Sequence, residues 1–179
     1  MPIPTSAEAK VSLREISAST VRAVTDLRVA PEQEGYVASN AVSIAQAYFH
    51  REEAWFRSIH AEDLLIGFVM LRDETLLPPL PVPAQLSLWR FMIDRRYQGV
   101  GFGRKALELV VEHARTRPGI AALETSYVVG PHGPVAFYLS FGFRHTGETK
   151  PNGEVVIALE LTEHSNAIHR TPGLAQRGG

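Results

Sequence analysis

Hydrophobic and polar positions along the chain predict a strand, a turn and a helix between residues 86 and 115. The apolar run 86–93 predicts a buried strand. From about residue 103 the apolar side chains recur at the i, i+3, i+4, i+7 spacing of an amphipathic helix, at Ala106, Leu107, Val110, Val111 and Ala114. The rest of the chain is expected to pack around this unit.

The same patterns predict the other elements. Strands are expected over residues 11–16, 55–60, 64–71, 121–129, 143–147 and 154–161, and helices over 21–29, 41–50 and 134–141. The second of these helices is expected to bury, or nearly bury, Val42, Ala45, Ala47, Tyr48 and Phe49. Prolines between residues 76 and 83 exclude a central strand, because each removes a ladder donor, and predict a long surface loop.

The turn between the central strand and helix is rich in glycine. Gly99, Gly101 and Gly103 alternate with Val100 and Phe102, so the backbone can take left-handed torsions and a ligand can approach closely. The following helix directs unpaired N–H groups and its positive dipole end into the turn. This combination predicts a main-chain site for phosphate or pyrophosphate. The alternative is a turn that only packs helix on sheet.

Two other phosphate motifs fit poorly. A Walker A loop needs G-K-[ST], but Lys105 follows Arg104 and precedes Ala106. A dinucleotide fingerprint fits Gly101-x-Gly103-x-x-Ala106, with Glu124 about 20 residues further on. That match is interpreted as accidental, because the polar segment 94–98 separates strand from glycines.

Composition limits the function classes. The 179 residues, 45% hydrophobic and 21% charged, predict one globular domain at 10–162, with a flexible leader at 1–9 and a flexible tail at 163–179. The chain has no cysteine, which excludes disulfides and a cysteine nucleophile. A net charge of −1 argues against a nucleic-acid partner, and the histidines lack metal-site spacing. Without a membrane-length apolar run or signal peptide, a cytoplasmic location is expected.

Two motifs resemble the GNAT superfamily of N-acetyltransferases. Residues 98–103, Q-G-V-G-F-G, resemble its acetyl-CoA signature [R/Q]-x-x-G-x-[G/A], and residues 138–143, Y-L-S-F-G-F, resemble its Y-x-x-x-G-F. Residues 29–40, V-A-P-E-Q-E-G-Y-V-A-S-N, are similar to a segment of bacterial spermine/spermidine acetyltransferases. The expected fold is a mixed α/β (α+β) domain: a mostly antiparallel twisted sheet of six to seven strands, about four helices on both faces, and a splayed central parallel strand pair.

The resemblance implies roles in holding acetyl-CoA. Main-chain groups of Phe91, Met92 and Ile93 are expected to bind the pantetheine arm. The pyrophosphate is assigned to Gln98, Gly99, Val100, Gly101, Phe102, Gly103 and Arg104. Tyr138 stands where the family places a proton donor to the departing thiolate. With pKa values of about 8.5 for a thiol and 10 for tyrosine, full transfer is uphill by roughly 2 kcal/mol, so Tyr138 is expected to act mainly as a hydrogen-bond donor. The alternative is an aromatic side chain packed under the glycine turn.

The general base is less clearly marked. Related enzymes often carry an acid at the position of Ser126, and Glu124 lies two residues earlier on the same strand face. The hypothesis is that Glu124 acts through a water held by Ser126; an exposed strand-edge glutamate is the alternative. Pro131 stands where many members carry a cofactor-binding asparagine; a proline side chain cannot make that contact, which is therefore expected to be absent or to be replaced, with His132 as the candidate.

Carboxylates and aromatic side chains suggest the acceptor. Glu32, Glu34, Glu52 and Glu53 are interspersed with Tyr36, Tyr48, Trp55 and Trp89, and of these Glu32, Glu34, Tyr36, Tyr48 and Trp89 are the candidate substrate-binding residues. The predicted substrate is a small primary amine, foremost a polyamine such as spermidine or spermine, acetylated directly in a ternary complex. The open alternatives are a solvated acidic surface, a protein or peptide N-acetyltransferase, and a non-catalytic acyl-CoA sensor. Related enzymes are frequently homodimers, but the sequence does not determine oligomeric state.

Overall fold

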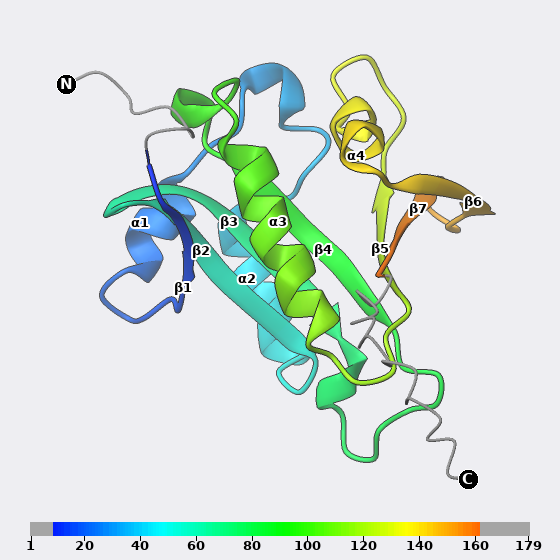
Figure 1. Ribbon diagram of the computed structural model, residues 1–179. Coiled ribbons are helices and arrows are strands. Elements are labelled where there is room, and N and C mark those ends of the chain that lie inside the picture. The colour runs from blue at the N-terminus through cyan, green and yellow to red at the C-terminus, as the bar shows by residue number, and fades with distance from the viewer. Residues whose placement is uncertain (1–8, 162–179) are drawn as a thin grey trace, which may run out of the picture.

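The computed structural model describes residues 9–161, which form one seven-stranded sheet with helices on both faces (Figure 1). The strands are β1 (Val11–Arg14), β2 (Ala54–Ala61), β3 (Leu64–Asp73), β4 (Leu86–Ile93), β5 (Ala122–Tyr127), β6 (Arg144–Thr149) and β7 (Val155–Glu160). Their order in the sheet is β1-β2-β3-β4-β5-β7-β6. Every neighbouring pair is antiparallel except β4 and β5, which are parallel. The predicted fold class is therefore confirmed.

Four α-helices cover the sheet in the described part of the chain. They are α1 (Val21–Asp26), α2 (Asn40–Phe49), α3 (Phe102–Arg115) and α4 (Val135–Phe141), and the short 3-10 turns are η1 (Pro31–Gln33), η2 (Glu74–Leu76) and η3 (Arg95–Tyr97). Helix α3 crosses one face of the sheet, whereas α1 and α2 lie on the other (Figure 1). Helix α4 lies beside the end of the sheet that carries β5, β6 and β7 (Figure 1).

The core has two parts, one on each face of the sheet. Strand β3 contributes to both: Ile66, Val69 and Leu71 pack toward α3, while Phe68 and Met70 pack toward α1 and α2. This double burial explains why β3 is a nearly continuous apolar run rather than an alternating one. The predicted face of α3 is confirmed, because all of its predicted apolar positions are buried.

The predicted buried face of α2 is wrong except at Ala47, which is buried as predicted. Val42, Tyr48 and Phe49 are 49%, 60% and 81% exposed, whereas Asn40 and Ser43 are buried. The polar side chains can face inward because the backbone satisfies them. The Asn40 Nδ2 group donates to the carbonyl of Val24 at 2.9 Å, and the Ser43 hydroxyl donates to the carbonyl of Ser39 at 3.0 Å.

The parallel strands β4 and β5 touch only near their beginnings. Ser87 and Glu124 form the one registered pair, and the Thr125 hydroxyl donates to the carbonyl of Leu88 at 2.9 Å. Immediately afterwards β4 bulges, because Leu88 pairs with Leu71 and Arg90 pairs with Met70, which leaves Trp89 as an extra residue. Beyond this point the two strands are separated by a cavity, as the predicted splay requires.

The remaining segments are partly outside the described residues. The predicted leader and tail lie there, apart from Ala9, whose side chain is buried. Residues 77–85 form neither helix nor strand, in agreement with the loop predicted from the prolines. No helix within residues 9–161 has the length and apolarity that crossing a membrane requires.

Candidate active site

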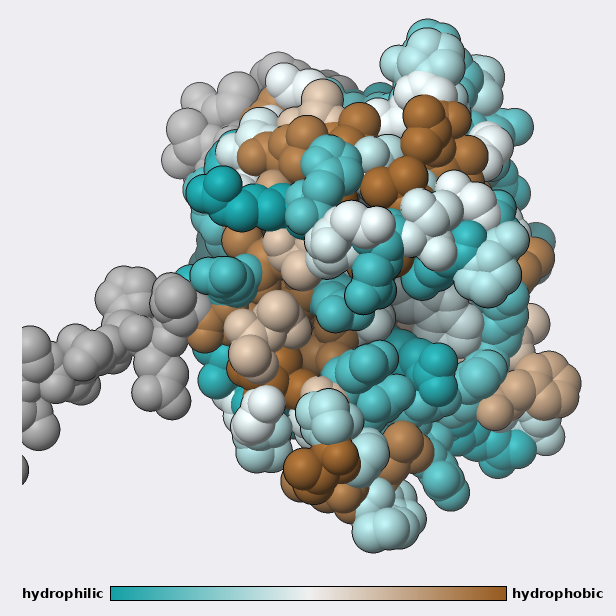
Figure 2. Space-filling view, turned by 90° about the vertical axis from the view of Figure 1, so that its right-hand side faces the viewer, coloured by the Kyte–Doolittle hydropathy of each residue, from teal (hydrophilic) through white to brown (hydrophobic). Residues whose placement is uncertain are grey.

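A cavity of about 1540 Å³ opens between the diverging ends of β4 and β5. It is lined by β4 and β5, the glycine turn before α3, the start of α4, the segment after η1 and the β6–β7 turn. On the face that carries α4, β6 and β7, the surface is hollowed between mainly hydrophilic side chains (Figure 2). The cavity therefore joins the glycine turn to polar residues contributed by five other parts of the chain.

The glycine turn presents unpaired amides to this cavity. Gly99 and Gly101 have φ values of +77° and +90°, and Gly101 is the N-cap of α3. Gly103, which was expected to share these torsions, instead lies within the first helical turn. Within residues 9–161 no amide from Gly99 to Arg104 donates to a protein acceptor; the first that does is that of Lys105. Such free amides at a helix N-terminus suit a diphosphate.

Two side chains of the turn hold the surrounding protein in place. The Gln98 Nε2 group donates to the carbonyl of Ile93 at 2.8 Å and to the side-chain oxygen of Gln33 at 2.9 Å, and so ties the turn to β4 and η1. The Arg104 guanidinium donates to the carbonyl of Ser140 at 3.0 Å, which joins α3 to α4. Both residues also line the cavity.

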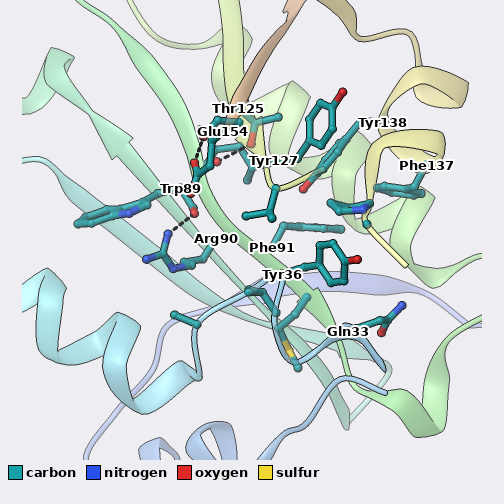
Figure 3. Close-up of a pocket in the computed structure, with 18 of the residues that line it drawn as sticks. Gln33, Tyr36, Trp89, Arg90, Phe91, Thr125, Tyr127, Phe137, Tyr138 and Glu154 are labelled. Atoms are coloured by element: carbon teal, nitrogen blue, oxygen red, sulfur yellow. Dashed lines mark hydrogen bonds between the residues drawn. The ribbon is translucent and has the colours of Figure 1, made fainter. Parts of the chain in front are cut away.

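Tyr138 extends from α4 into the cavity and is 5% exposed (Figure 3). Its ring packs edge-on against Phe137 and Phe143. Burial raises the pKa of Tyr138 above its ordinary value, and the nearby Thr125 hydroxyl offsets only part of this rise. A neutral tyrosine can donate a hydrogen bond but is a poor source of a proton, which makes full transfer to a thiolate more unfavourable than in an exposed tyrosine.

On β5, Ser126 contacts a carboxylate from a distant part of the chain. The Ser126 hydroxyl donates to Glu154 Oε2 at 2.5 Å, and Asn152 Nδ2 donates to Glu154 Oε1 at 3.0 Å. Both Ser126 and Glu154 line the cavity, as does Glu124 on the same strand as Ser126. Figure 3 shows the position of Glu154. A hydroxyl and two carboxylates are therefore gathered at one wall.

Arg90, on β4, is one of the cationic residues that line the cavity. Its guanidinium donates to the carbonyl of Trp89 at 2.7 Å (Figure 3) and to Gln46 Oε1 on α2 at 3.0 Å. Burial lowers the pKa of Arg90, and the negative charge of Glu154 partly offsets this effect. Arg90 is thus fixed beneath the cavity by neutral acceptors, with Glu154 as its nearby counter-charge.

Tyr36 closes the cavity from the segment after η1. Its hydroxyl accepts a hydrogen bond from the backbone N–H of His132 at 3.4 Å. Gly130 makes this contact possible, since a Cβ there would overlap the Tyr36 hydroxyl. The loop that carries Pro131 in place of the family asparagine is therefore joined to the segment resembling polyamine acetyltransferases.

The structure brings most of the predicted site residues together. The cavity is lined by Phe91, Met92, Ile93, Gln98, Gly99, Gly101, Gly103, Arg104, Glu124, Ser126, Tyr138, Glu34, Tyr36 and Trp89. Val100 and Phe102 do not line it, and Phe102 is fully buried in the core. Glu32 and Tyr48 are also absent from its walls; Tyr48 lines a smaller surface hollow near the end of α2.

Trp55 and Glu53 were also grouped with the acceptor residues. Trp55 lies elsewhere, and Glu53 already forms ion pairs within the protein. Trp55 stacks on His113 of α3, on the opposite face of the sheet. Burial acts to raise the pKa of Glu53, but hydrogen bonds from Arg72 and His50 outweigh it and hold that pKa below its ordinary value. Glu53 therefore links α2 to β3, and its neighbours His50 and Arg72 line the cavity in its place.

Glu154 and Arg90 are two charged residues of the cavity that were not predicted from the sequence. Glu154 directly follows the Asn152-Gly153 turn, so its place in a hairpin could be predicted from the sequence. What could not be read was that β7 pairs with β5, with Ser126 opposite Val156, which brings the turn to this wall. Arg90 lay in a strand read as apolar, and the bulge at Trp89 decides where it points.

Free amides at a helix N-terminus, a splayed parallel strand pair and a buried tyrosine between them define an enzyme class that transfers acyl groups from a coenzyme A thioester. Residues 17–143 match the Acetyltransferase (GNAT) family, and this chain belongs to it. It is an N-acetyltransferase that takes its acetyl group from acetyl-CoA.

Similar proteins agree with this assignment. The chain is 28% identical to the spermine/spermidine N(1)-acetyltransferase of Bacillus subtilis (strain 168), over 84% of this chain and 99% of that protein. Its fold is similar to that of an aminoglycoside acetyltransferase in complex with coenzyme A (TM-score 0.67, 14% identity, 84% of this chain and 95% of that one). It is also similar to Arabidopsis thaliana Naa50 in complex with a bisubstrate analogue (TM-score 0.57, 18% identity, 83% and 97%).

Proposed function

We propose that this enzyme acetylates a small primary amine, foremost a polyamine such as spermidine or spermine, by direct transfer within a ternary complex. The observation that carries the proposal is one continuous cavity with the glycine turn, whose amides are free, on one side and carboxylates with aromatic rings on the other. The first side suits a diphosphate and the second suits an ammonium group.

The donor side fits coenzyme A through main-chain groups. The amides of the glycine turn would hold the pyrophosphate, and the cavity walls at Phe91, Met92 and Ile93 would flank the pantetheine arm. Because β5 pairs with β4 only at Ser87, the later backbone groups of β4 on that side have no strand partner. Such an edge can receive the amide groups of an extended arm, as an added strand would.

The acceptor side combines three carboxylates with two aromatic rings. Glu34, Glu124 and Glu154 line it together with Tyr36 and Trp89. A polyamine carries several ammonium groups on a flexible chain, which ion pairing and cation–π contact can hold at intervals. The named activity of the Bacillus subtilis relative supports the same substrate class. Arg90 is itself positively charged and limits how many ammonium groups fit beside it at the inner end of the cavity. We therefore expect a part of the polyamine that carries one or two positive charges to enter first.

The reaction needs an unprotonated amine and a stabilised leaving group. An ammonium with pKa near 10 must lose a proton before its nitrogen can attack the thioester carbonyl carbon, and Glu124 and Ser126 are the residues proposed from the sequence for this step. As the new C–N bond forms and the C–S bond breaks, the Tyr138 hydroxyl would donate a hydrogen bond to the departing sulfur, and the second proton that the nitrogen loses on becoming an amide would neutralise the thiolate. The chain has no cysteine to carry the acetyl group, in keeping with direct transfer.

Thiol release from acetyl-CoA tests the proposal. The purified enzyme would be assayed with spermidine, spermine, putrescine, amino acids and short peptides, and kcat/KM compared across the panel. The expected result is the highest kcat/KM with a polyamine. A peptide or a neutral or anionic amine as the best acceptor would contradict the polyamine assignment. Coenzyme A binding without thiol release on any amine would instead indicate an acyl-CoA sensor.

A further inference from the structure

We propose that Glu154 is the acceptor of the proton that the reacting ammonium loses, with the Ser126 hydroxyl as the relay between them. The inference rests on the proposed function only in requiring an amine as acceptor, whichever amine that is. From the sequence, Ser126 was paired with Glu124. In the structure, Ser126 instead forms a hydrogen bond with Glu154.

The contact itself has the direction that a relay needs. The Ser126 hydroxyl donates to Glu154 Oε2 at 2.5 Å, so the Ser126 oxygen keeps its lone pairs to accept an N–H from the cavity. Both residues line the cavity at the end of β5, where β4 and β5 have separated. An ammonium placed against Ser126 would therefore lie one hydroxyl away from a carboxylate.

The β6–β7 turn holds Glu154 in this orientation. Asn152 Nδ2 donates to Glu154 Oε1 at 3.0 Å, while Asn152 Oδ1 accepts from the Glu154 backbone N–H at 3.2 Å. The backbone N–H of Lys150 donates to the Glu154 carbonyl at 2.8 Å and closes the turn. Both carboxylate oxygens are thus engaged, which fixes the side chain before substrate binds.

Glu124 lacks these features. Its carboxylate makes no hydrogen bond within residues 9–161, and it lies two residues from Ser126 along the strand, a spacing of about 7 Å that requires a bridging water. The charged residues that line the cavity on the elements next to the Glu154 turn are Arg90 on β4, Glu124 on β5, Glu148 on β6 and Lys150 in the turn.

The transfer balances in protons and charge. The ammonium donates one N–H proton to the Ser126 oxygen as the Ser126 hydroxyl proton passes to Glu154 Oε2. The products are a neutral amine, an intact serine hydroxyl and a neutral Glu154 carboxyl. After acetyl transfer, Glu154 returns its proton to solvent, because the turn that carries it is exposed at Pro151, Asn152 and Gly153.

The test compares three matched variants: Glu154→Gln, Glu124→Gln and Glu160→Gln. Glu160 is an exposed residue on β7 that does not line the cavity, so it controls for loss of a nearby charge. Each variant would be assayed from pH 6 to 9.5 with the best amine of the panel, and coenzyme A affinity measured by calorimetry would show that the fold is intact.

In the Glu154→Gln variant, kcat is expected to fall about 100-fold at pH 7, within the range typical of general-base loss. The deficit should shrink about tenfold per pH unit as free amine accumulates, because the variant depends on amine that is already deprotonated. Ser126→Ala should show the same pH dependence, and combining it with Glu154→Gln should add little. Glu154→Asp should recover part of the activity.

A deficit that is constant with pH would overturn the inference, because a structural or binding role gives that result. So would a rise in KM with unchanged kcat, or the pH-dependent deficit appearing in Glu124→Gln instead of Glu154→Gln. Wild-type turnover tests the proposed function separately, since the inference concerns only the ratio between variant and wild type.

Discussion

The Asp94 carboxylate accepts a hydrogen bond from the backbone N–H of Arg28 at 3.0 Å, although 66 positions separate the two residues. In return the Arg28 carbonyl accepts from the backbone N–H of Arg95 at 2.8 Å. Asp94 also caps η3, accepting from the Arg96 backbone N–H at 3.0 Å. These contacts join the segment after α1 to the strand end that leads into the glycine turn.

Replacing Asp94 by asparagine should destabilise the protein by about 1–3 kcal/mol, because a side chain that is 3% exposed loses charge-assisted hydrogen bonds. Urea unfolding would measure the change. The control is Asp63→Asn in the β2–β3 turn, where the side chain is 99% exposed and a loss below about 1 kcal/mol is expected. Equal losses at the two sites would contradict this account.

The same residue predicts a pH dependence of stability. Burial acts to raise the pKa of Asp94, but hydrogen bonds from Arg96 and from the Arg28 backbone outweigh it and leave the pKa lowered. A carboxyl whose folded pKa is lowered stabilises the protein above its unfolded pKa of about 4, and this stability is lost as the pH falls through the folded value. The stability difference between wild type and Asp94→Asn should therefore narrow below pH 4. A difference that stayed constant to pH 2 would contradict the assignment.

Tyr138→Phe should lower kcat about 100-fold, with coenzyme A affinity changed less than threefold, because the hydroxyl serves the leaving group rather than the bound coenzyme. Tyr97→Phe, which removes a buried tyrosine hydroxyl elsewhere, is the control. Since burial raises the pKa of Tyr138, ionisation of this residue should produce no alkaline loss of kcat below pH 10. If Tyr138→Phe kept the wild-type kcat, the Tyr138 hydroxyl would have no role in the reaction and the ring would serve only in packing.

Gly99→Ala should weaken coenzyme A binding about tenfold, because its φ of +77° places a side chain in strained backbone at the amide cradle. Gly119→Ala is a matched control: its φ is +72°, no protein atom lies within 4 Å of the added Cβ, and the residue does not line the cavity. Both variants should lose about 1–2 kcal/mol of stability from the strained torsion. Only Gly99→Ala should lose coenzyme A affinity, which calorimetry would measure. An equal loss of coenzyme A affinity in both variants would show that backbone strain alone causes the effect.

Gly67→Ala should destabilise the protein by about 1–3 kcal/mol through overpacking. A Cβ at Gly67 would overlap the carbonyl oxygen of Met92 and come within 3.0 Å of the Ile93 side chain. Because β3 would push this part of β4 away, coenzyme A affinity should fall as well. Thermal unfolding and calorimetry would measure the two effects. A variant as stable as wild type would show that β4 can shift at no cost.

The sequence predicted elements whose signals are local. The bounds of β4 agree with the apolar run, and the face of α3 agrees with its 3.6-residue period. The prediction for α2 failed because hydropathy counts Asn40 and Ser43 as polar, whereas backbone carbonyls of α1 and the N-cap satisfy them inside the protein. Tyr48 and Phe49 were consequently assigned to the wrong side of the helix.

The site was predictable where a motif covers it. The glycine turn and Tyr138 lie in the two family motifs, and both line the cavity. Glu154 depends on which strands pair, a long-range choice that hydrophobic patterns do not encode. Glu32 and Tyr48 were grouped with the acceptor residues by composition alone, and the fold carries their side chains away from the cavity.

The single registered pair between Ser87 and Glu124 divides the sheet into two antiparallel parts, the β1–β4 meander and the β5-β7-β6 group. The pantetheine arm of coenzyme A, inserted between β4 and β5, would supply hydrogen bonds that the two strands do not make with each other. The acetyl donor would then also hold the two parts of the sheet together. Hydrogen exchange of the backbone amides along the facing edges of β4 and β5 should slow when the coenzyme binds.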